Sequence, residues 1–391
     1  MTAAVYIHIP FCKTKCGYCD FYSIPEEKSI FLQNKPVQNE IIKNEYIKKL
    51  CADIEFKLKM FSVTEVNSVY IGGGTPSSLG AKHTAALLSF LQKILPNKPL
   101  EFTIEANPES MDADFLSACR EGGVDRISVG VQSFNEKSRS SVGRLGGSDM
   151  LMERLALLAG YYNDFSADLM SGLPYQNEKI LVYDITTLLR YKPSHISFYD
   201  LSVEENTPLW KLRKSGNAAL TGTEEAEKLW IYGRDILEKS GFEQYEVSNF
   251  AYNGKRSLHN INYWRMGNWL GVGAAASGTI INENPLKGLR YTVPPDLELY
   301  IRSDFDDIIT EELDVKTLIK ENFLMGFRYI DGPDQNLFYK RFNMDIEDAA
   351  PKTIKRWREK KLFQKEKTAL TKDGLLFLNA FLTECFLEID K

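Results

Sequence analysis

A strand-then-helix alternation, repeated six times up to residue 239, constrains the fold of this chain more than any other feature. Six short runs rich in β-branched and aromatic residues are typical of buried strands: residues 3–9, 67–73, 101–107, 125–132, 164–170 and 195–201. Helical patterns follow them at residues 40–61, 81–95, 112–121, 148–160, 178–190 and 223–239. Because strands that alternate with helices pair in parallel, these units predict a parallel sheet.

The number of units predicts a sheet that curves without closing. Six units are too few for the usual eight-stranded barrel, so we expect an α/β fold with a partial, TIM-like (β/α)6 barrel. Polar and Gly-rich segments follow the strands, where barrel enzymes place their sites. These segments are residues 8–23, GGGTPS (72–77), EANPES (105–110), VQSF (131–134), DLMSGLP (168–174) and YDLSVEENTP (199–208). We therefore expect all of them at one rim of the barrel.

The pattern changes after the sixth unit, which suggests three parts. Residues 1–250 are expected to form the partial barrel. Residues 251–312 include the segment 257–278, which is dense in aromatic, Gly and Ala residues and is expected to close off the barrel. Residues 313–391 predict three or four helices with a small hairpin at 362–371, a pattern compatible with a smaller, helical, winged-helix-like C-terminal domain.

The composition indicates a globular protein and argues against nucleic-acid-binding, membrane-spanning and disulfide-rich classes. The 391 residues are 43% hydrophobic and 26% charged with a formal net charge of -5, which fits a globular enzyme and gives no general attraction to nucleic acid. No apolar run approaches the length of a membrane span, and the start MTAAVYIHIPF lacks the features of a signal peptide. Three of the six cysteines are scattered, which argues against a disulfide framework. We expect a cytoplasmic protein.

The other three cysteines, Cys12, Cys16 and Cys19, stand together in HIPFCKTKCGYCDFYS. A structural zinc site and an ordinary iron–sulfur electron carrier each take four protein ligands, so three cysteines suggest a centre with one open position. A [4Fe-4S] cluster held by three thiolates would leave one iron free to bind a small molecule. The alternatives are a zinc site completed by His8, and cysteines that coincide by accident.

Polar residues after later strands extend this candidate site. Gly72, Gly73 and Gly74 can bring the backbone close to a ligand and offer amides to an anionic group, although glycine runs also form plain turns. The other polar residues are Glu105, Gln132, Arg144 and Asp168. Each of them taken singly could instead be a surface ion pair or a strand-end cap.

The spacing Cys-x3-Cys-x2-Cys, followed by GGGTPS, resembles the radical S-adenosylmethionine (SAM) superfamily, in which a reduced cluster cleaves SAM to a radical. The resemblance implies a [4Fe-4S] cluster on Cys12, Cys16 and Cys19, and SAM as a second cofactor. It implies that Arg144 suits the SAM carboxylate. The resemblance also implies that Glu105, Gln132 and Asp168 suit the amino group and the ribose hydroxyls of SAM, and that Tyr6 and Tyr18 pack against it. The other implied SAM-binding residues are Gly73, Gly74 and Thr75.

A closer resemblance covers essentially the whole chain. YIHIPFC, YIGGGTPS, EANPE, RISVGVQSF, DLMSGLP, QYEVSNFA and HNINYW fall in the order seen in the family similar to oxygen-independent coproporphyrinogen III oxidase. The dehydrogenase carries a further cysteine where this chain has Phe21, and a long segment ahead of the cluster motif, whereas eleven residues precede Cys12 here. Both differences favour the haem-chaperone (HemW) branch.

That branch implies haem or porphyrin as the ligand and haem-accepting proteins, membrane-associated ones included, as partners. The alternatives are a coproporphyrinogen III dehydrogenase of porphyrin biosynthesis and another radical SAM enzyme with a changed substrate. The branch motif HNxxYW places a candidate haem ligand at His259, which could equally be a hydrogen-bonded core histidine. Gly146 and Ser277 stand where the family often has histidines. If haem binding in the family depends on those histidines, this chain should bind haem more weakly.

A basic segment lies in the C-terminal part. Residues 352–367 hold eight Lys or Arg and two Glu. We interpret this segment as a solvated helix face with Trp357 turned inward, because the protein around it is acidic. Docking to an acidic partner or to an anionic membrane surface is the alternative, and nucleic acid is not expected as a partner.

Overall fold

Seven neighbouring parallel strands form the centre of this protein, whose computed structural model describes residues 1–26, 30–32, 35–216, 220–305 and 307–391. The sheet has twelve strands in the order β11-β12-β10-β9-β8-β7-β6-β1-β13-β14-β15-β16. All six predicted strands are confirmed, as β1 (Thr2–Ile9), β6 (Glu65–Gly73), β7 (Glu101–Ala106), β8 (Arg126–Gln132), β9 (Phe165–Ser171) and β10 (His195–Asp200). They pair in parallel with their neighbours, which confirms the α/β fold and the parallel arrangement.

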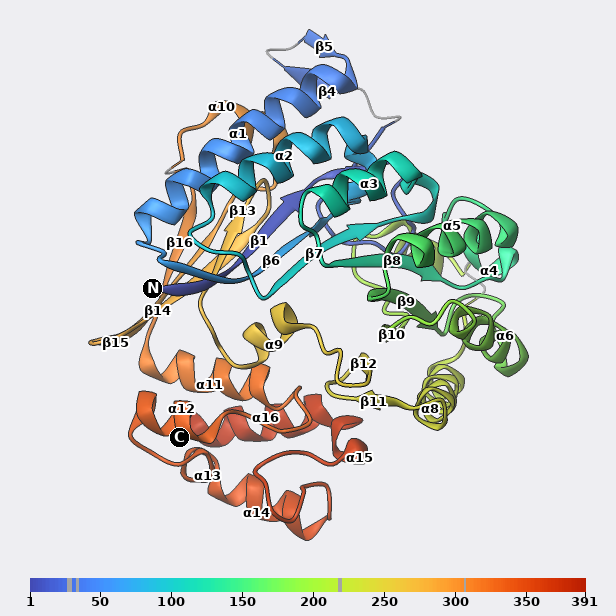
Figure 1. The fold of residues 1–391 in the computed structure, drawn as a ribbon. Helices are drawn as coiled ribbons and strands as arrows, with labels where there is room; N and C mark the ends of the chain where they lie inside the picture. Colours follow the sequence, from blue (N-terminus) through green and yellow to red (C-terminus); the bar gives the residue numbers. More distant parts are fainter. Residues whose placement is uncertain (27–29, 33–34, 217–219, 306) are drawn as a thin grey trace.

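Helices cover the convex side of this sheet (Figure 1). The six predicted helices are confirmed as α1 (Asn39–Met60), α2 (Gly80–Ile94), α3 (Ala113–Glu121), α5 (Ser148–Tyr161), α6 (Glu178–Leu189) and α8 (Thr223–Lys239). Short elements join them: η1 (Pro76–Leu79), η2 (Pro108–Ser110), α4 (Glu136–Ser141) and α7 (Pro208–Lys214). Two small sheets, β2 (Phe11–Cys12) with β3 (Ile24–Pro25) and β4 (Ile30–Leu32) with β5 (Lys35–Val37), lie in the segment between β1 and α1.

The strands carry apolar residues toward the helices and polar residues into the barrel. On β8, Ile127 and Val129 belong to the core that the sheet shares with the helices. The alternate residues Arg126 and Ser128 contact polar groups from other strands and loops. Because side chains alternate across a strand, one sequence builds both the apolar core and a polar lumen.

Residues 251–312 extend the sheet, and their expected role in closing off the barrel stays a prediction. β13 (Trp269–Val272) adds in parallel to the free edge of β1, where Val5 lies opposite Leu270. Antiparallel strands β14 (Ser277–Glu283), β15 (Leu286–Thr292) and β16 (Ile309–Leu313) continue from it. On the other side, β12 (Asn249–Tyr252) and β11 (Phe242–Gln244) follow β10. The sheet therefore stays open between β11 and β16.

Two further helices come from this stretch. Helix α9 (Leu258–Trp264) lies on the concave side of the sheet, between the sheet and the C-terminal helices (Figure 1). Helix α10 (Leu297–Arg302) packs on α1 through a ring contact between Tyr300 and Tyr46, whose centroids are 5.3 Å apart. The concave face is thus covered by the segment that carries the HNxxYW motif.

The C-terminal module is helical, with its own core. Its helices are α11 (Val315–Gly326), α12 (Gln335–Phe342), α13 (Ile346–Ala349), α14 (Pro351–Glu359), α15 (Lys372–Leu375) and α16 (Leu378–Ile389), which is more than the three or four expected. The predicted hairpin is reduced to one antiparallel bridge between Phe363 and Leu370. Phe327 packs against Phe323, Phe363 and Phe381 at the centre of this core. The domain limits at 250 and 312 stay predictions.

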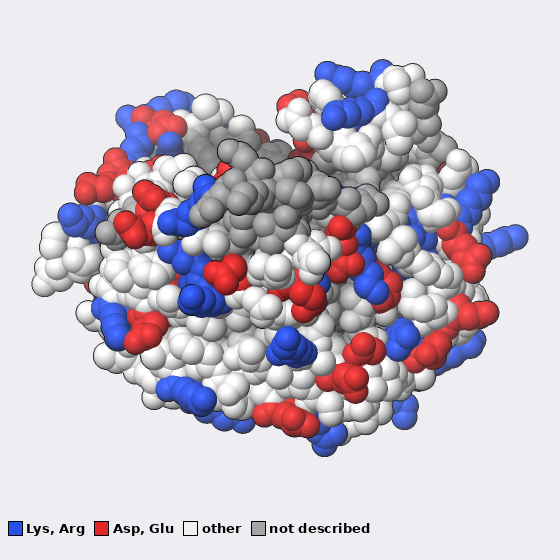
Figure 2. Space-filling view, turned by 90° about the horizontal axis from the view of Figure 1, so that it is seen from above, with Lys and Arg blue, Asp and Glu red and all other residues white. Residues whose placement is uncertain are grey.

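Charges of both signs mix on the surface. On the face seen from above, Lys and Arg alternate with Asp and Glu without a field of one sign (Figure 2). Within the basic segment, Arg356 pairs with Glu384, Arg358 with Glu347 and Lys367 with Asp331. Trp357 is buried, as expected. No helix of the described residues is long and apolar enough to cross a bilayer.

We predict that Phe327→Ala destabilises the C-terminal module by about 3–5 kcal/mol, because it removes a fully buried ring from the core. Phe377→Ala is the matched control: Phe377 is 54% exposed, so its loss should cost less than about 0.5 kcal/mol. Hydrogen exchange of the α11 and α16 amides measures both effects. Equal protection in the two variants would contradict this account of the core.

Candidate functional site

The cysteine segment lies at the carboxyl end of the parallel strands, and its backbone ties it to three other rim segments. Gly17 N–H donates to Val142 O at 2.9 Å, and Gly17 O accepts from Leu209 N–H at 2.7 Å. Thr75 N–H donates to Phe11 O at 2.7 Å. Of the segments expected to share one rim, residues 8–23 and 72–77 are therefore in contact, and residues 8–23 also contact Val142 and Leu209.

The three thiols differ in burial. Cys12 is buried and its Sγ lies 3.3 Å from Thr75 Oγ1, while Cys16 and Cys19 are half-buried. Burial raises the pKa of Cys19 to about 11, and the neighbouring Cys16 and Cys12 add to the rise. All three thiols are free. Within the described residues, however, no three His, Cys, Asp or Glu side chains are already grouped as a metal site, so a ligand assignment rests on the donor set rather than on a preformed cage.

The glycines of GGGTPS allow close packing of the chain, and the amides of Gly73 and Gly74 already have partners within the protein. Gly74 N–H donates to Ile9 O at 2.8 Å, and Gly73 N–H donates to Glu105 Oε2 at 3.3 Å. Gly73 has a φ of +112°, and a Cβ there would lie 2.5 Å from the His8 ring. Only glycine fits this position, since both the backbone angle and the space exclude a side chain.

Arg144 lies beside the cysteine segment and is buried. Its Nη2 donates to Asn107 Oδ1 at 2.9 Å and to Gly130 O, and its Nη1 lies 3.7 Å from Cys16 Sγ. Asn107 in turn donates to Thr75 Oγ1 at 2.9 Å. Sequence reasoning did not single out Asn107, although its place directly after a strand was a usable signal. The Nε of Arg144 is buried without a partner among the described residues, which leaves one donor for a bound group.

Glu105 and Asp168 enter the lumen from β7 and β9. Glu105 accepts from Tyr70 Oη at 2.8 Å, and burial raises its pKa to about 7. Asp168 accepts from Ser128 Oγ at 3.4 Å, and burial raises its pKa to about 6. Neither carboxylate has a cationic partner in an ion pair among the described residues, so both could receive a positively charged group of a ligand.

Gln132, Tyr6 and Tyr18 complete the predicted set. Gln132 ends β8 beside a register irregularity and has a φ of +68°, a conformation that costs free energy for a residue with a side chain. Tyr6 Oη lies 3.1 Å from His8 Nδ1, and the Tyr6 ring stacks on Tyr70. Tyr18, in the cysteine segment, packs against the apolar cluster around Val142.

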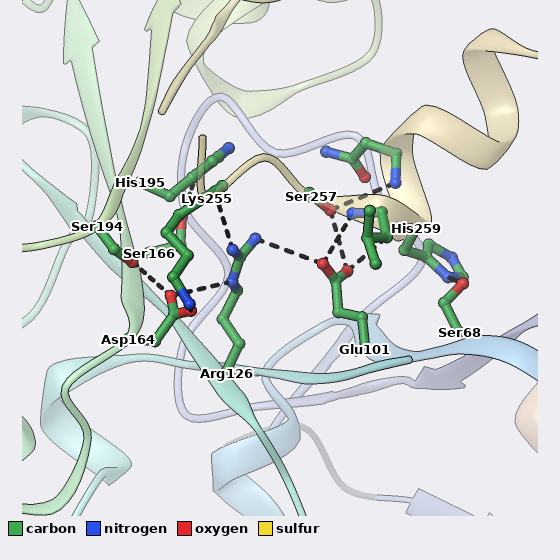
Figure 3. Close-up of polar contacts among 12 residues, drawn as sticks. Ser68, Glu101, Arg126, Asp164, Ser166, Ser194, His195, Lys255, Ser257 and His259 are labelled. Atoms are coloured by element: carbon green, nitrogen blue, oxygen red, sulfur yellow. Dashed lines mark hydrogen bonds and ion pairs between the residues drawn. The ribbon is translucent and has the colours of Figure 1, made fainter. Parts of the chain in front are cut away.

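His259 lies at the other end of the lumen, near the amino ends of the strands (Figure 3). Its Nδ1 is 2.9 Å from Ser68 Oγ and its Nε2 is 2.9 Å from Tyr263 Oη. The side chain is 1% exposed, and burial lowers its pKa to about 3. Both ring nitrogens are therefore engaged, which favours the core-histidine interpretation, and the role of His259 as a haem ligand stays a prediction.

A buried carboxylate holds the segment of His259 in place. Glu101 accepts hydrogen bonds from Leu258 N–H at 2.8 Å and His259 N–H at 3.1 Å (Figure 3). Arg126 lies between Glu101 and Asp164, with ion pairs of 3.6 Å to each. Lys255 pairs with Asp164 at 3.1 Å. This network seals the amino end of the lumen, opposite to the cysteines.

Gly146 and Ser277, the two residues that stand where the family often has histidines, each have defined surroundings in the structure. A Cβ on Gly146, where φ is +78°, would lie 1.8 Å from Met150 Cε. Ser277 Oγ lies 2.8 Å from Thr292 Oγ1 across β14 and β15. Phe21, at the position where the dehydrogenase has a cysteine, is 63% exposed. None of these residues adds a metal ligand to the rim.

Comparison with known proteins identifies the relatives of this architecture. Residues 6–185 match the family described as the radical SAM superfamily. Heme chaperone HemW of Bacillus subtilis is 32% identical over 97% of this chain and 99% of its own length. Heme chaperone HemW of Buchnera aphidicola (strain Sg) is 34% identical over 72% of this chain and 71% of its own. Coproporphyrinogen III oxidase (HemN) of Escherichia coli shares the fold, with a TM-score of 0.80 at 19% identity over 98% of this chain and 89% of its own.

The raised pKa of Glu105 predicts a pH dependence of stability. The unfolded chain ionises this carboxyl near pH 4.3, whereas the folded protein does so at about 7. Between these values the folded state binds more protons, so the free energy of unfolding falls as pH rises, by on the order of 4 kcal/mol for this group. Glu105→Gln should remove that part of the slope. Denaturant unfolding from pH 4 to 8 measures it, with the exposed Glu224→Gln as control. Parallel curves for wild type and Glu105→Gln would refute the assignment.

Proposed function

This chain belongs to the HemW family of the radical SAM superfamily, and we propose from that membership that it is a haem chaperone, which binds haem and passes it to acceptor proteins. The observation that carries this proposal is the match to the Bacillus subtilis relative along nearly the full length of both chains. The location proposed for this activity is the cytoplasm, and acceptors at a membrane are the proposed partners.

Membership in the superfamily implies a [4Fe-4S] cluster and SAM. We propose Cys12, Cys16 and Cys19 as the cluster ligands, because they are three free thiols of one short segment at the rim. A site-differentiated cluster supplies one-electron reduction of a sulfonium such as that of SAM. Three protein ligands suit that task, since the fourth iron stays open.

The residues proposed to surround SAM line the same rim. Arg144, with its unpartnered buried Nε, suits a carboxylate. Glu105 and Asp168 suit the amino group and the ribose hydroxyls. The amides of Gly73 and Gly74 already have partners within the protein. These glycines would therefore contribute by allowing the backbone to lie close to SAM. The full proposed set is Tyr6, Tyr18, Gly73, Gly74, Thr75, Glu105, Gln132, Arg144 and Asp168.

We predict that Cys16→Ala abolishes a site-differentiated [4Fe-4S] cluster while leaving the fold intact, because a thiolate ligand is lost but the loop keeps its backbone hydrogen bonds. Iron and sulfide analysis with absorbance of anaerobically reconstituted protein measures the loss. Cys119→Ala is the control, since Cys119 is buried in the core away from the rim and its replacement should leave iron content unchanged. Full iron content in Cys16→Ala would reject the ligand assignment.

The chaperone proposal itself predicts transfer. Haem-loaded, cluster-containing protein mixed with an apo-form of a haem protein should yield the acceptor's holo-spectrum faster than free haem does at equal concentration. Incubation with coproporphyrinogen III, SAM and a reductant should yield no protoporphyrinogen. Porphyrin product would replace the chaperone proposal by the dehydrogenase, and absence of transfer would reject it.

A further inference from the structure

A cleft of about 1100 Å³ lies between the carboxyl end of β10, helix α8 and the C-terminal module. The barrel contributes Tyr199 and Trp230, and the module contributes Arg328 and residues 375–379. This volume is at the upper end of the range for small-molecule sites. The cleft therefore has room for a ligand larger than most metabolites.

Apolar side chains from two separate parts of the chain are exposed in this cleft. Tyr199 is 41% exposed, and Leu376 and Phe377 on the facing module are 42% and 54% exposed. Contiguous exposed apolar residues in a concave surface mark binding sites. Aromatic side chains on facing walls suit a flat, apolar ring.

Two cations line the same cleft. Neither Arg213 nor Arg328 makes an ion pair with any described residue, and Arg328 lies over the Trp264 ring at 5.8 Å. Of the carboxylates that also line the cleft, Asp200 accepts from Ser171 Oγ at 3.1 Å and Glu204 accepts from Ser202. Glu227 is the remaining one. Burial raises the pKa of Glu246, which does not line the cleft, and Arg328 partly offsets that rise. Two guanidinium groups that make no ion pair in the described part of the chain, beside an apolar wall, suit a ligand with two carboxylates.

A buried polar atom in the cleft wall also lacks a partner. Gln244 is 4% exposed and lines the cleft; its Nε2 donates to Glu246 O at 3.1 Å and Val247 O at 3.2 Å. Its Oε1 is buried and accepts no hydrogen bond within the described residues.

The cleft adjoins the cysteine rim. Leu201 and Val203, which line the cleft, pack in one apolar cluster with Tyr18 of the cysteine segment. A ligand in the cleft would thus lie next to the proposed cofactor site.

We propose that this cleft binds the haem: the ring lies between Tyr199 and Phe377, and the two propionates bind Arg213 and Arg328. The identity of the ligand rests on the proposed function, whereas the cleft and its chemistry follow from the structure. No His, Cys or Met lines the cleft in the part of the chain that the structure describes. The ring is therefore held by its faces and its carboxylates, and iron is not required for binding.

The test compares hemin with metal-free protoporphyrin IX, titrated into full-length, cluster-loaded protein. Wild type should bind both with affinities within a few-fold of each other. The double variant R213Q/R328Q should weaken both by about tenfold or more, because charge-assisted hydrogen bonds to two carboxylates are lost. Phe377→Ala should weaken both to a similar degree. The double variant K352Q/K355Q, which removes two exposed charges from α14 outside the cleft, should bind like wild type.

The outcomes separate this inference from the chaperone proposal. Hemin binding and transfer that persist unchanged in the R213Q/R328Q and Phe377→Ala variants would overturn the cleft and leave the chaperone intact. Binding of hemin without protoporphyrin IX would also overturn it, since iron ligation would then hold the ring. Cleft-dependent porphyrin binding without transfer would support the cleft and reject the chaperone. A wild type that binds neither porphyrin would reject both.

Discussion

The parallel strands must bury an apolar face against the helices and also surround a polar interior, and the two-residue repeat of a β-strand meets both demands. Along β1, Val5 and Ile7 face the helices while Tyr6 contacts lumen side chains. The pairing of Tyr6 with Tyr70 on β6 brings residues of the same orientation side by side. A shift of register by one residue would exchange the two faces. The lumen and its chemistry therefore depend on the same constraint as the core.

The two ends of the lumen serve different purposes. At the carboxyl end, the free thiols, Arg144 and the carboxylates Glu105 and Asp168, which make no ion pair with any described residue, leave donors and acceptors for a ligand. At the amino end, Glu101 accepts from backbone amides and Arg126 forms ion pairs with Glu101 and Asp164, so the charges there are matched, while Arg126 Nη1 makes no hydrogen bond within the described residues. The HNxxYW motif belongs to this second, sealed end. The contacts of this motif are thus those of a structural element, although its residue types also suit a cofactor.

The sequence was sufficient to predict the six strands and helices, because each has a clear repeat and a buried face. It also predicted which segments share the rim, since carboxyl ends of parallel strands meet at one edge. It could not predict that Trp269–Val272 adds to β1, because a short apolar run does not reveal its partner strand. The same limit applied to His259, whose role depends on Ser68 and Tyr263. The engaged amides of Gly73 and Gly74 likewise depend on tertiary contacts with Glu105 and Ile9.

The rim holds the cysteine segment through its backbone, which leaves the thiols available. Gly17 both donates to Val142 and accepts from Leu209, and Thr75 donates to Phe11, so the position of the loop does not depend on any sulfur atom. Side chains that contact the thiols, such as Thr75 and Arg144, are themselves fixed by Asn107. A site built this way separates positioning from ligation. A cysteine ligand can then be replaced while the cysteine segment keeps its conformation. The fold therefore stays stable with only three cysteines, which leave one coordination position of the metal centre open.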